Sequence, residues 1–276
     1  MKAIPLFSAT ISVYKNDNPN YFRLALDSIL NQTVKPNEII ITVDGPVPDA
    51  IEKVLQDYSK NELIRVIRAD KNQGLGLAHA MAVSNSKYDW LAIMDADDIS
   101  VPNRFEKQLS VIAEHPEIGI IGGQIEEFID EPDNIVGIRN VPLDNVAIKK
   151  YLKKRCPFNH MSIMLNTKLV KAAGNYQDWH YNEDYYLYCR LYEYGTIFCN
   201  LPDVLVKVRV GQEMYKRRGG WKYFKSEAKL QRWMLRHKII SFPRYCMNVL
   251  IRLCVQVLMP NWLRGFVFQK LFRTKK

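Results

Sequence analysis

The chain has 276 residues, of which 47% are hydrophobic and 25% are charged, a globular composition that argues against a disordered or fibrous protein. Its five cysteines are odd in number and contain no C-x-x-C pair, which argues against a disulfide framework and a zinc site. The beginning, MKAIPLFSATISVY, has a proline and no long apolar run, so it does not resemble a signal peptide. We therefore expect a protein with free thiols in the cytosol.

The net charge of +10 is distributed unevenly along the chain. Residues 214–276 hold 16 of the 39 Lys and Arg and a single acid, Glu227, which gives this segment a charge of +15. Residues 1–213 carry −5. A basic segment attached to an acidic body indicates an anionic partner, either nucleic acid or phospholipid headgroups.

The first half of the sequence alternates between predicted strands and helices. Apolar or β-branched runs predict strands at 9–14, 38–43, 63–67 and 90–94. Helices are predicted between them, beginning at Asn18-Pro19, near residue 51 and after KNQGLG (71–76). This order predicts an α/β fold with a Rossmann-like, mostly parallel sheet and helices on both faces. Tyr14, Asp44 and the acids at 95–98 follow strand ends, where such sheets bind ligands.

The second half is less regular. Helices are predicted at 102–114, 144–154 and 183–194, and strands near 118–121 and at 162–165, 196–199 and 204–209. From about residue 220 the chain is expected to be helical and basic to its end.

Three carboxylates follow the fourth predicted strand in WLAIMDADD: Asp95, Asp97 and Asp98. A D-x-D at a strand end suits Mn²⁺ or Mg²⁺, which prefer carboxylate oxygens together with substrate phosphates. The alternative is an acidic loop in which Asp98 or Ser100 caps the next helix. An EF-hand is disfavoured because Ser100 stands where that loop needs glycine.

Five segments in this order, over about residues 8–210, resemble the family 2 glycosyltransferases with the GT-A fold: ISVYKNDNPNYFRLALDSILNQT, EIIITVDGP, DKNQGLGLAHAM, WLAIMDADD and NEDYYLYCRL. The bacterial members that build capsule, exopolysaccharide or O-antigen are the most similar. The resemblance implies a catalytic domain at 1–213, with a nucleotide-sugar-binding half at about 1–100 (the donor half) and an acceptor half at about 101–213. Residues 214–276 would then be a separate basic helical tail.

The resemblance also implies roles on the donor side. The residues that would contact the nucleotide are Ser12, Tyr14, Asp44, Asn72 and Asp95. Gly74 belongs to the same loop as Asn72, Asp97 would bind the metal, and the role of Asp98 stays open. A plain turn at Asp44-Gly45 and a simple helix cap at 72–74 are the alternatives.

On the acceptor side, the E-D of NEDYYLYCRL matches the family motif whose Asp is the base. Asp184 would deprotonate the acceptor hydroxyl, with Glu183 in support, or both acids merely stabilise a helix N-terminus. His160 and Asn159 could contact the acceptor or the diphosphate, or be structural. Trp179 and His180 could line the acceptor cleft. Arg217 and Arg218 could neutralise the diphosphate, or face solvent or lipid.

The basic tail contains PRYCMNVLIRLCVQVLM (243–259), where Arg244, Asn248, Arg252 and Gln256 are each four residues apart. They form one narrow polar stripe on an otherwise apolar helix. With Trp262 and flanking bases, this pattern predicts a helix in the interface of an anionic membrane. The alternative is a helix packed on the core or on a partner. No nucleic-acid motif is present, and no nucleic acid is expected.

Together these features predict a metal-dependent inverting glycosyltransferase, peripheral at the cytoplasmic face of the inner membrane. It would transfer a sugar from a UDP-sugar to a lipid-linked oligosaccharide in bacterial surface polysaccharide synthesis. The alternative is a non-catalytic membrane-associated or nucleic-acid-binding protein that keeps the fold as a scaffold.

Overall fold

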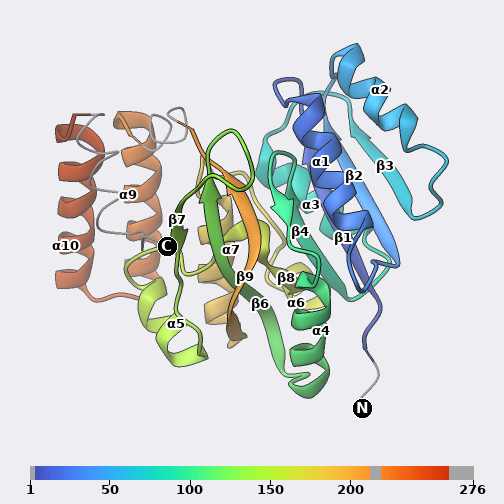
Figure 1. The fold of residues 1–276 in the computed structure, drawn as a ribbon. Helices are drawn as coiled ribbons and strands as arrows, with labels where there is room; N and C mark the ends of the chain where they lie inside the picture. Colours follow the sequence, from blue (N-terminus) through green and yellow to red (C-terminus); the bar gives the residue numbers. More distant parts are fainter. Residues whose placement is uncertain (1–3, 212–218, 261–276) are drawn as a thin grey trace.

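The structure, a computed structural model, describes residues 4–211 and 219–260 (Figure 1). Its donor half has four parallel strands in the order β3-β2-β1-β4. These strands and their helices are β1 (Phe7–Val13), α1 (Pro19–Leu30), β2 (Glu38–Asp44), α2 (Asp49–Asp57), β3 (Ile64–Ala69), α3 (Leu75–Asn85) and β4 (Trp90–Asp95). The predicted alternation is confirmed, and α1 begins where Asn18 Oδ1 accepts the Asn20 N–H at 2.9 Å.

The central strands are covered by helices on both faces, as the continuous apolar runs predicted. In β2, Ile39 and Ile41 pack with α1 and α2, whereas Ile40 packs with α3 in a second cluster. Because successive side chains of a strand point to opposite faces, a strand buried on both sides needs apolar residues at every position.

The acceptor half extends the same sheet, which has nine strands in the described part of the chain. Beyond β4 the order is β8-β6-β9-β5, with β7 paired to β6, and β8 is antiparallel to both of its neighbours. The elements are β5 (Ile99–Ser100), α4 (Arg104–Glu114), β6 (Ile118–Phe128), β7 (Ile135–Arg139), α5 (Asn145–Leu152), the short 3-10 helix η1 (His160–Ser162), β8 (Met164–Asn166), α6 (Thr167–Ala172), α7 (Glu183–Glu193) and β9 (Ile197–Arg209).

Two strands are longer than predicted. β6 runs on through Gly122 and Gly123, and β9 joins the two short strands expected at 196–199 and 204–209. The two long strands pair in parallel with register shifts near Gly122, where a Cβ would lie only 2.4 Å from Asn200 Oδ1. The glycines therefore allow close packing rather than ending the strand.

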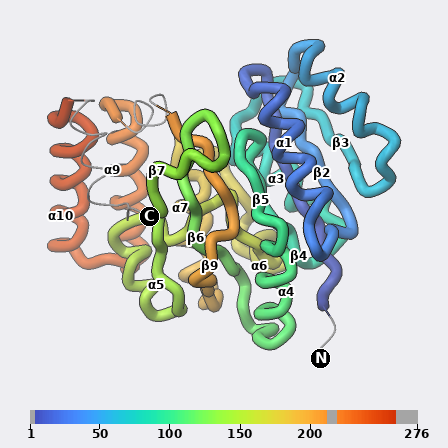
Figure 2. The backbone as a smooth tube through the Cα atoms, in the orientation of Figure 1, coloured from blue at the N-terminus to red at the C-terminus, as the bar shows by residue number. Residues whose placement is uncertain are grey.

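The helices after residue 219 pack against the acceptor half. They are α9 (Trp221–Arg236), α10 (Phe242–Leu253) and the π-helical turn η2 (Cys254–Leu258). α9 and α10 lie side by side at one edge of the molecule, α10 outermost (Figures 1 and 2). Leu230 and Met234 of α9 share a hydrophobic cluster with Leu187 and Tyr188 of α7. A boundary at 213/214 stays a prediction, and no helix in the two described ranges has the length and apolarity to cross a bilayer.

Candidate functional site

A cleft of about 920 Å³ opens beyond the carboxyl ends of β1, β2, β4 and β9. Parallel pairing brings these ends together, with Ser12 opposite Asp95 and Val13 opposite Val43. The predicted site residues that line the cleft are Ser12, Tyr14, Asp44, Asn72, Gly74, Asp95, Asp97, Asp98, His160, Trp179, His180, Glu183 and Asp184. Arg217 and Arg218 lie outside the described residues.

Asp44 holds the loop that forms one side of the donor half of the cleft. Its two carboxylate oxygens accept hydrogen bonds from the backbone N–H groups of Gln73 at 2.7 Å and Gly74 at 2.9 Å. Gly45 adopts φ +84°, and a Cβ there would lie 2.5 Å from the Asn72 nitrogen. The chain therefore bends sharply at Gly45, close to the backbone of residue 72. Each carboxylate oxygen has a second lone pair, so Asp44 can also accept a bond from a ligand.

The three acids after β4 form a compact cluster. One carboxylate oxygen from each of Asp95, Asp97 and Asp98 lies within 4.8 Å of the others. Asp98 is 2% exposed and accepts the backbone N–H of Arg209 at 2.9 Å, so its side chain fastens this turn to β9. This contact is different from the helix-capping role considered for Asp98.

The electrostatics of the cluster favour a bound cation. Burial, followed by repulsion from Asp97, Asp17 and Asp184, raises the pKa of Asp95 to about 7. Burial and repulsion from Asp97 also raise the pKa of Asp98. Hard oxygen ligands that repel one another fit Mn²⁺ or Mg²⁺, because the ion would neutralise the charge that destabilises them.

Glu183 and Asp184 form the first turn of α7, on the acceptor side of the cleft. Asp184 accepts the Tyr185 N–H at 2.6 Å and a weak bond from the Cys156 thiol at 3.5 Å. Burial, then repulsion from Asp184, raises the pKa of Glu183 to about 8. The adjacent carboxyls of Glu183 and Asp184 therefore hold a proton more readily than a free carboxyl does, and a protonated carboxyl can donate a hydrogen bond.

Gly76 brings the two halves of the cleft into contact. A Cβ at this position of α3 would lie 2.9 Å from Glu183 Cβ and 3.0 Å from Gln177 O. The first turns of α3 and α7 can approach this closely because residue 76 has no side chain.

His160 lines the cleft, and its ring is held in place by contacts with Tyr188 and His79. Its Nδ1 lies 2.7 Å from the Tyr188 hydroxyl, and its ring packs edge-on against that of His79 at 4.9 Å. Burial lowers the pKa of His160 to about 3. A neutral imidazole offers a hydrogen bond rather than a positive charge. Asn159 instead donates to Gly123 O at 2.8 Å and does not line the cleft.

Arg209 lines the cleft and was not anticipated from the sequence. Its guanidinium carbon lies 3.7 Å from the ring centroid of Tyr21 and 4.6 Å from that of Phe128. Arg209 ends the strand predicted at 204–209, which the structure shows to be parallel to β6, so the strand-end argument applies to it as it does to Asp44. Asp17, which accepts the Tyr14 N–H at 2.8 Å, is another lining residue without a motif of its own.

The fold and this cleft define the class as an α/β protein with an acidic site at the carboxyl edge of a mostly parallel sheet. Comparison with known proteins identifies the family. The model of "Glycosyl transferase family 2" matches residues 8–171. The chain belongs to this family.

Two relatives match nearly the whole chain. "Amylovoran biosynthesis glycosyltransferase AmsE" of Erwinia amylovora is 36% identical over 96% of this chain and 98% of its own. "UDP-Gal:alpha-D-GlcNAc-diphosphoundecaprenol beta-1,3-galactosyltransferase" of Escherichia coli is 34% identical over 98% of this chain and 97% of its own length. The resemblance to bacterial polysaccharide glycosyltransferases is confirmed.

Among solved structures, the mannosyltransferase PcManGT from Pyrobaculum calidifontis, in complex with GDP-Man and Mn²⁺, superposes with a TM-score of 0.64 at 16% identity. The superposition covers 95% of this chain and 73% of the mannosyltransferase chain. At this identity the similarity concerns the fold, and the predicted GT-A fold is confirmed.

Proposed function

We propose that this glycosyltransferase moves a sugar from a nucleotide-sugar donor, a UDP-sugar, to a lipid-linked oligosaccharide during bacterial surface polysaccharide synthesis. The observation that carries the proposal is the convergence of the Asp95–Asp98 acids and the α7 acids on one cleft. The relative from Escherichia coli is named for a UDP-sugar and a diphosphoundecaprenol acceptor, and the relative from Erwinia amylovora for an exopolysaccharide; both names support this choice of substrates.

The donor half binds the nucleotide in this proposal. Ser12, Tyr14, Asp44 and Asn72 hold the base side, and Asp95 contacts the ribose. Tyr14 can stack on a pyrimidine, and the Asp44 carboxylate can accept the imide N–H. Asp97 holds Mn²⁺ or Mg²⁺, which would offset negative charge on the departing diphosphate.

On the acceptor side, Asp184 takes the proton from the attacking hydroxyl. A single displacement then forms the new glycosidic bond opposite the breaking bond to the nucleotide diphosphate, and the anomeric carbon is inverted. Glu183, whose pKa is raised by burial and by Asp184, donates a hydrogen bond to the acceptor in its protonated form and so positions the hydroxyl beside Asp184. His160, anchored by Tyr188, offers a neutral imidazole on the same side.

The lipid-linked acceptor implies work at a membrane surface. We place the chain peripherally at the cytoplasmic face of the inner membrane, bound to anionic lipid through residues 214–276. The charge of +15 on this segment supports this location.

The function can be tested with purified full-length protein and a set of UDP- and GDP-sugars. We expect one UDP-sugar to raise the melting temperature in Mn²⁺, and EDTA or Asp97→Asn to abolish this shift. Asp184→Asn should keep the shift and lose roughly 100-fold or more in transfer to a diphosphoundecaprenol-linked acceptor, since a general base contributes about 10²–10⁴.

Two results would contradict the proposal at different levels. Unchanged transfer by Asp184→Asn would exclude Asp184 as the base. A protein that binds no nucleotide sugar, and whose cellular role survives both substitutions, would be a scaffold rather than an enzyme.

A further inference from the structure

α10 and η2 turn an apolar surface outward. Their exposed large side chains are Phe242 at 64%, Met247 at 46%, Leu250 at 60%, Ile251 at 52% and Leu258 at 68%. The other exposed residues between 242 and 258 are Pro243, Cys246 and Cys254. The charged side chains of this range, Arg244 and Arg252, are both partly buried. We call this surface the α10 outer face.

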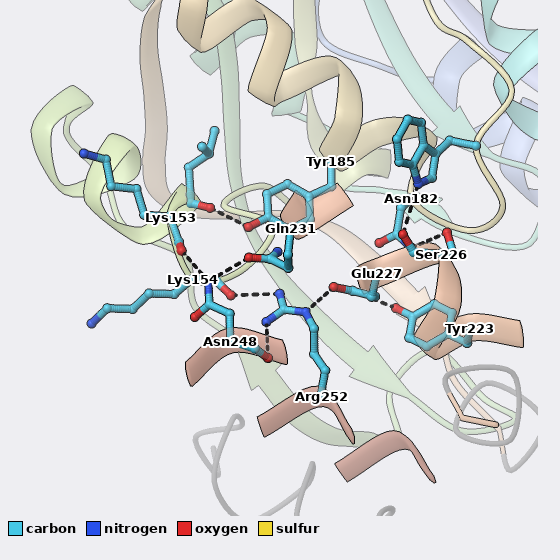
Figure 3. A network of polar contacts seen from close by, with 12 residues as sticks. Lys153, Lys154, Asn182, Tyr185, Tyr223, Ser226, Glu227, Gln231, Asn248 and Arg252 are labelled. Carbon is cyan, nitrogen blue, oxygen red and sulfur yellow. Dashed lines mark hydrogen bonds and ion pairs between the residues drawn. The ribbon is translucent and has the colours of Figure 1, made fainter. Parts of the chain in front are cut away.

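The polar stripe of the same helix faces the protein instead. Asn248 is 3% exposed and donates to Lys153 O at 2.9 Å and Gln231 Oε1 at 2.7 Å. Arg252 pairs with Glu227 and donates to Lys154 O at 3.0 Å (Figure 3). These polar contacts fix the rotation of α10 and oblige its apolar side to face outward.

α9, the neighbouring helix, exposes the opposite chemistry. Its exposed residues are Trp221, Lys222, Lys225, Lys229, Arg232 and Arg236. Five of these six are basic, and they follow one another at helical spacing of three or four residues. An apolar helix face beside a basic one complements anionic lipid, whose acyl chains accept apolar side chains and whose headgroups attract lysine and arginine.

Both helices are tied to the mouth of the cleft. Tyr223, in the first turn of α9, lines the cleft, and the Gly220 N–H donates to Gln256 O of η2 at 2.8 Å. The beginning of α9 and the η2 turn that follows α10 therefore lie together beside the site. A lipid-linked acceptor anchored in a bilayer at this edge would need little extra reach to enter it.

We propose that the α10 outer face inserts into an anionic membrane surface while the α9 basic stripe binds its headgroups, so that the cleft opens at the lipid–water interface. This proposal rests on the proposed function, because a lipid-linked acceptor is what makes the location useful. Contiguous exposed apolar surfaces mark interaction sites on soluble proteins.

Vesicle binding tests the proposal with the full chain. We expect binding to vesicles of phosphatidylcholine with phosphatidylglycerol, weaker binding at high salt, and little binding to phosphatidylcholine alone. Leu250→Gln with Ile251→Gln should lower the partition coefficient on the order of 100-fold. The matched control, Leu6→Gln with Leu24→Gln, changes residues that are 57% and 45% exposed in the donor half and should bind like the wild type.

The basic stripe has its own matched pair. Lys225→Gln with Arg232→Gln should weaken binding to anionic vesicles roughly 30-fold, whereas Lys53→Gln with Lys60→Gln should leave it unchanged. Wild-type binding by the Leu250/Ile251 variant, or equal losses in test and control pairs, would overturn the proposal.

Two native cysteines report on contact directly, because Cys246 and Cys254 are exposed on the α10 outer face. Anionic vesicles should slow their reaction with a charged maleimide at least tenfold, while the added thiol of Lys60→Cys stays reactive. Unchanged labelling would refute insertion. Slow labelling of Cys246 and Cys254 in the absence of vesicles would also refute insertion, because the α10 outer face would then be covered by protein. Light scattering would identify the cover as a second copy if the protein is dimeric, and as another segment of the chain if it is monomeric.

Membrane binding by the α10 outer face and the reaction in the cleft can be tested separately. The Leu250/Ile251 variant should keep wild-type donor hydrolysis, since neither residue lines the cleft. Absence of donor binding with vesicle binding intact would refute the proposed function and leave the membrane surface in place.

Discussion

Glu227 and Arg252 form an ion pair between α9 and α10, and we expect its disruption to loosen α10 from the protein (Figure 3). Their side chains are only 10% and 11% exposed. Burial is the largest single effect and lowers the pKa of Arg252, but attraction to Glu227, Tyr185 and Tyr223 and the hydrogen bond to Glu227 together raise it above its ordinary value. The guanidinium therefore stays charged and needs its partner.

The magnitude follows from the contacts that remain in Glu227→Leu. Removing one partner of a buried pair typically costs about 3–5 kcal/mol, because the other charge stays buried without compensation. Arg252 keeps its bonds to Lys154 O at 3.0 Å and Asn248 O at 3.3 Å, so we expect the low end, about 3 kcal/mol. Replacing both residues, as in Glu227→Leu with Arg252→Met, should return the free energy of unfolding to within about 1 kcal/mol of the wild type.

Equilibrium unfolding in urea measures these free energies, and the midpoint should fall by roughly 1 M or more in Glu227→Leu. The exposed pair of Glu52 and Arg68 is the control, with side chains 41% and 50% exposed at 2.7 Å. Glu52→Leu should cost less than about 1 kcal/mol. Equal effects of Glu52→Leu and Glu227→Leu, or a double variant as unstable as the single one, would refute the reasoning.

Substitutions at three further positions test other parts of the fold and cleft. Burial raises the pKa of Glu38, but its hydrogen bonds, including those from Arg65 at 2.7 and 3.0 Å, outweigh burial, so the pKa is lowered. Glu38→Gln should therefore cost roughly 2 kcal/mol of unfolding free energy at pH 7. Calorimetry should find this difference shrinking as the pH falls below about 4.5, and a constant difference would contradict the reasoning. Gly76→Ala should lower transfer about tenfold or more in steady-state assays by displacing Glu183, and an unchanged rate would count against the close approach. Asp98→Asn should keep its bond to the β9 backbone, whereas Asp98→Ala loses about 1–3 kcal/mol in urea unfolding; equal losses would argue against this role.

Much of the fold could be predicted from hydrophobic patterning. EIIITVD predicts a strand buried on both faces, and all seven residues of β2 are buried. The lengths of β6 and β9 were not predicted, because Gly122-Gly123 and Pro202-Asp203 resemble turns. The two glycines of β6 are explained only by the paired strand β9, whose Asn200 and Leu205 side chains fill the space that a Cβ would need. Such contacts join residues about 80 positions apart and leave no local signal.

One topological rule, that the carboxyl ends of parallel strands meet, predicted that Tyr14, Asp44 and the acids at 95–98 converge, whereas Glu183 and Asp184 were found through the resemblance to the family. The rule brought together Tyr14, Asp44 and Asp97, and their placement on one cleft follows it. The individual contacts did not follow from the sequence. That Asp98 binds the β9 backbone, and that His160 is held neutral beside Tyr188, depends on residues distant in the chain.

The orientation of α10 shows the same limit. A stripe of polar residues every fourth position predicts an amphipathic helix but not which side faces the protein. An ordinary surface helix buries its apolar side. Here Asn248 and Arg252 find a carboxylate, an amide and two backbone carbonyls on α9 and after α5, and these partners reverse the usual arrangement.

The acid cluster argues that the cleft is built for a ligand rather than for stability. Burying Asp95 and Asp98 beside Asp97 raises their pKa values and costs folding free energy. The fully buried Arg104 is the cation that lowers the pKa of Asp95, yet its own hydrogen bonds go to the backbone oxygens of Ile93 at 2.9 Å and Ile163 at 3.1 Å and to Gln108 Oε1 at 3.1 Å. A structural turn does not need three carboxylates, since one, Asp98, already fastens it to β9. A divalent cation and a diphosphate bound among the three acids would offset this repulsion, and their binding would stabilise the folded protein by an amount that rises with the logarithm of the ligand concentration once it exceeds the dissociation constant.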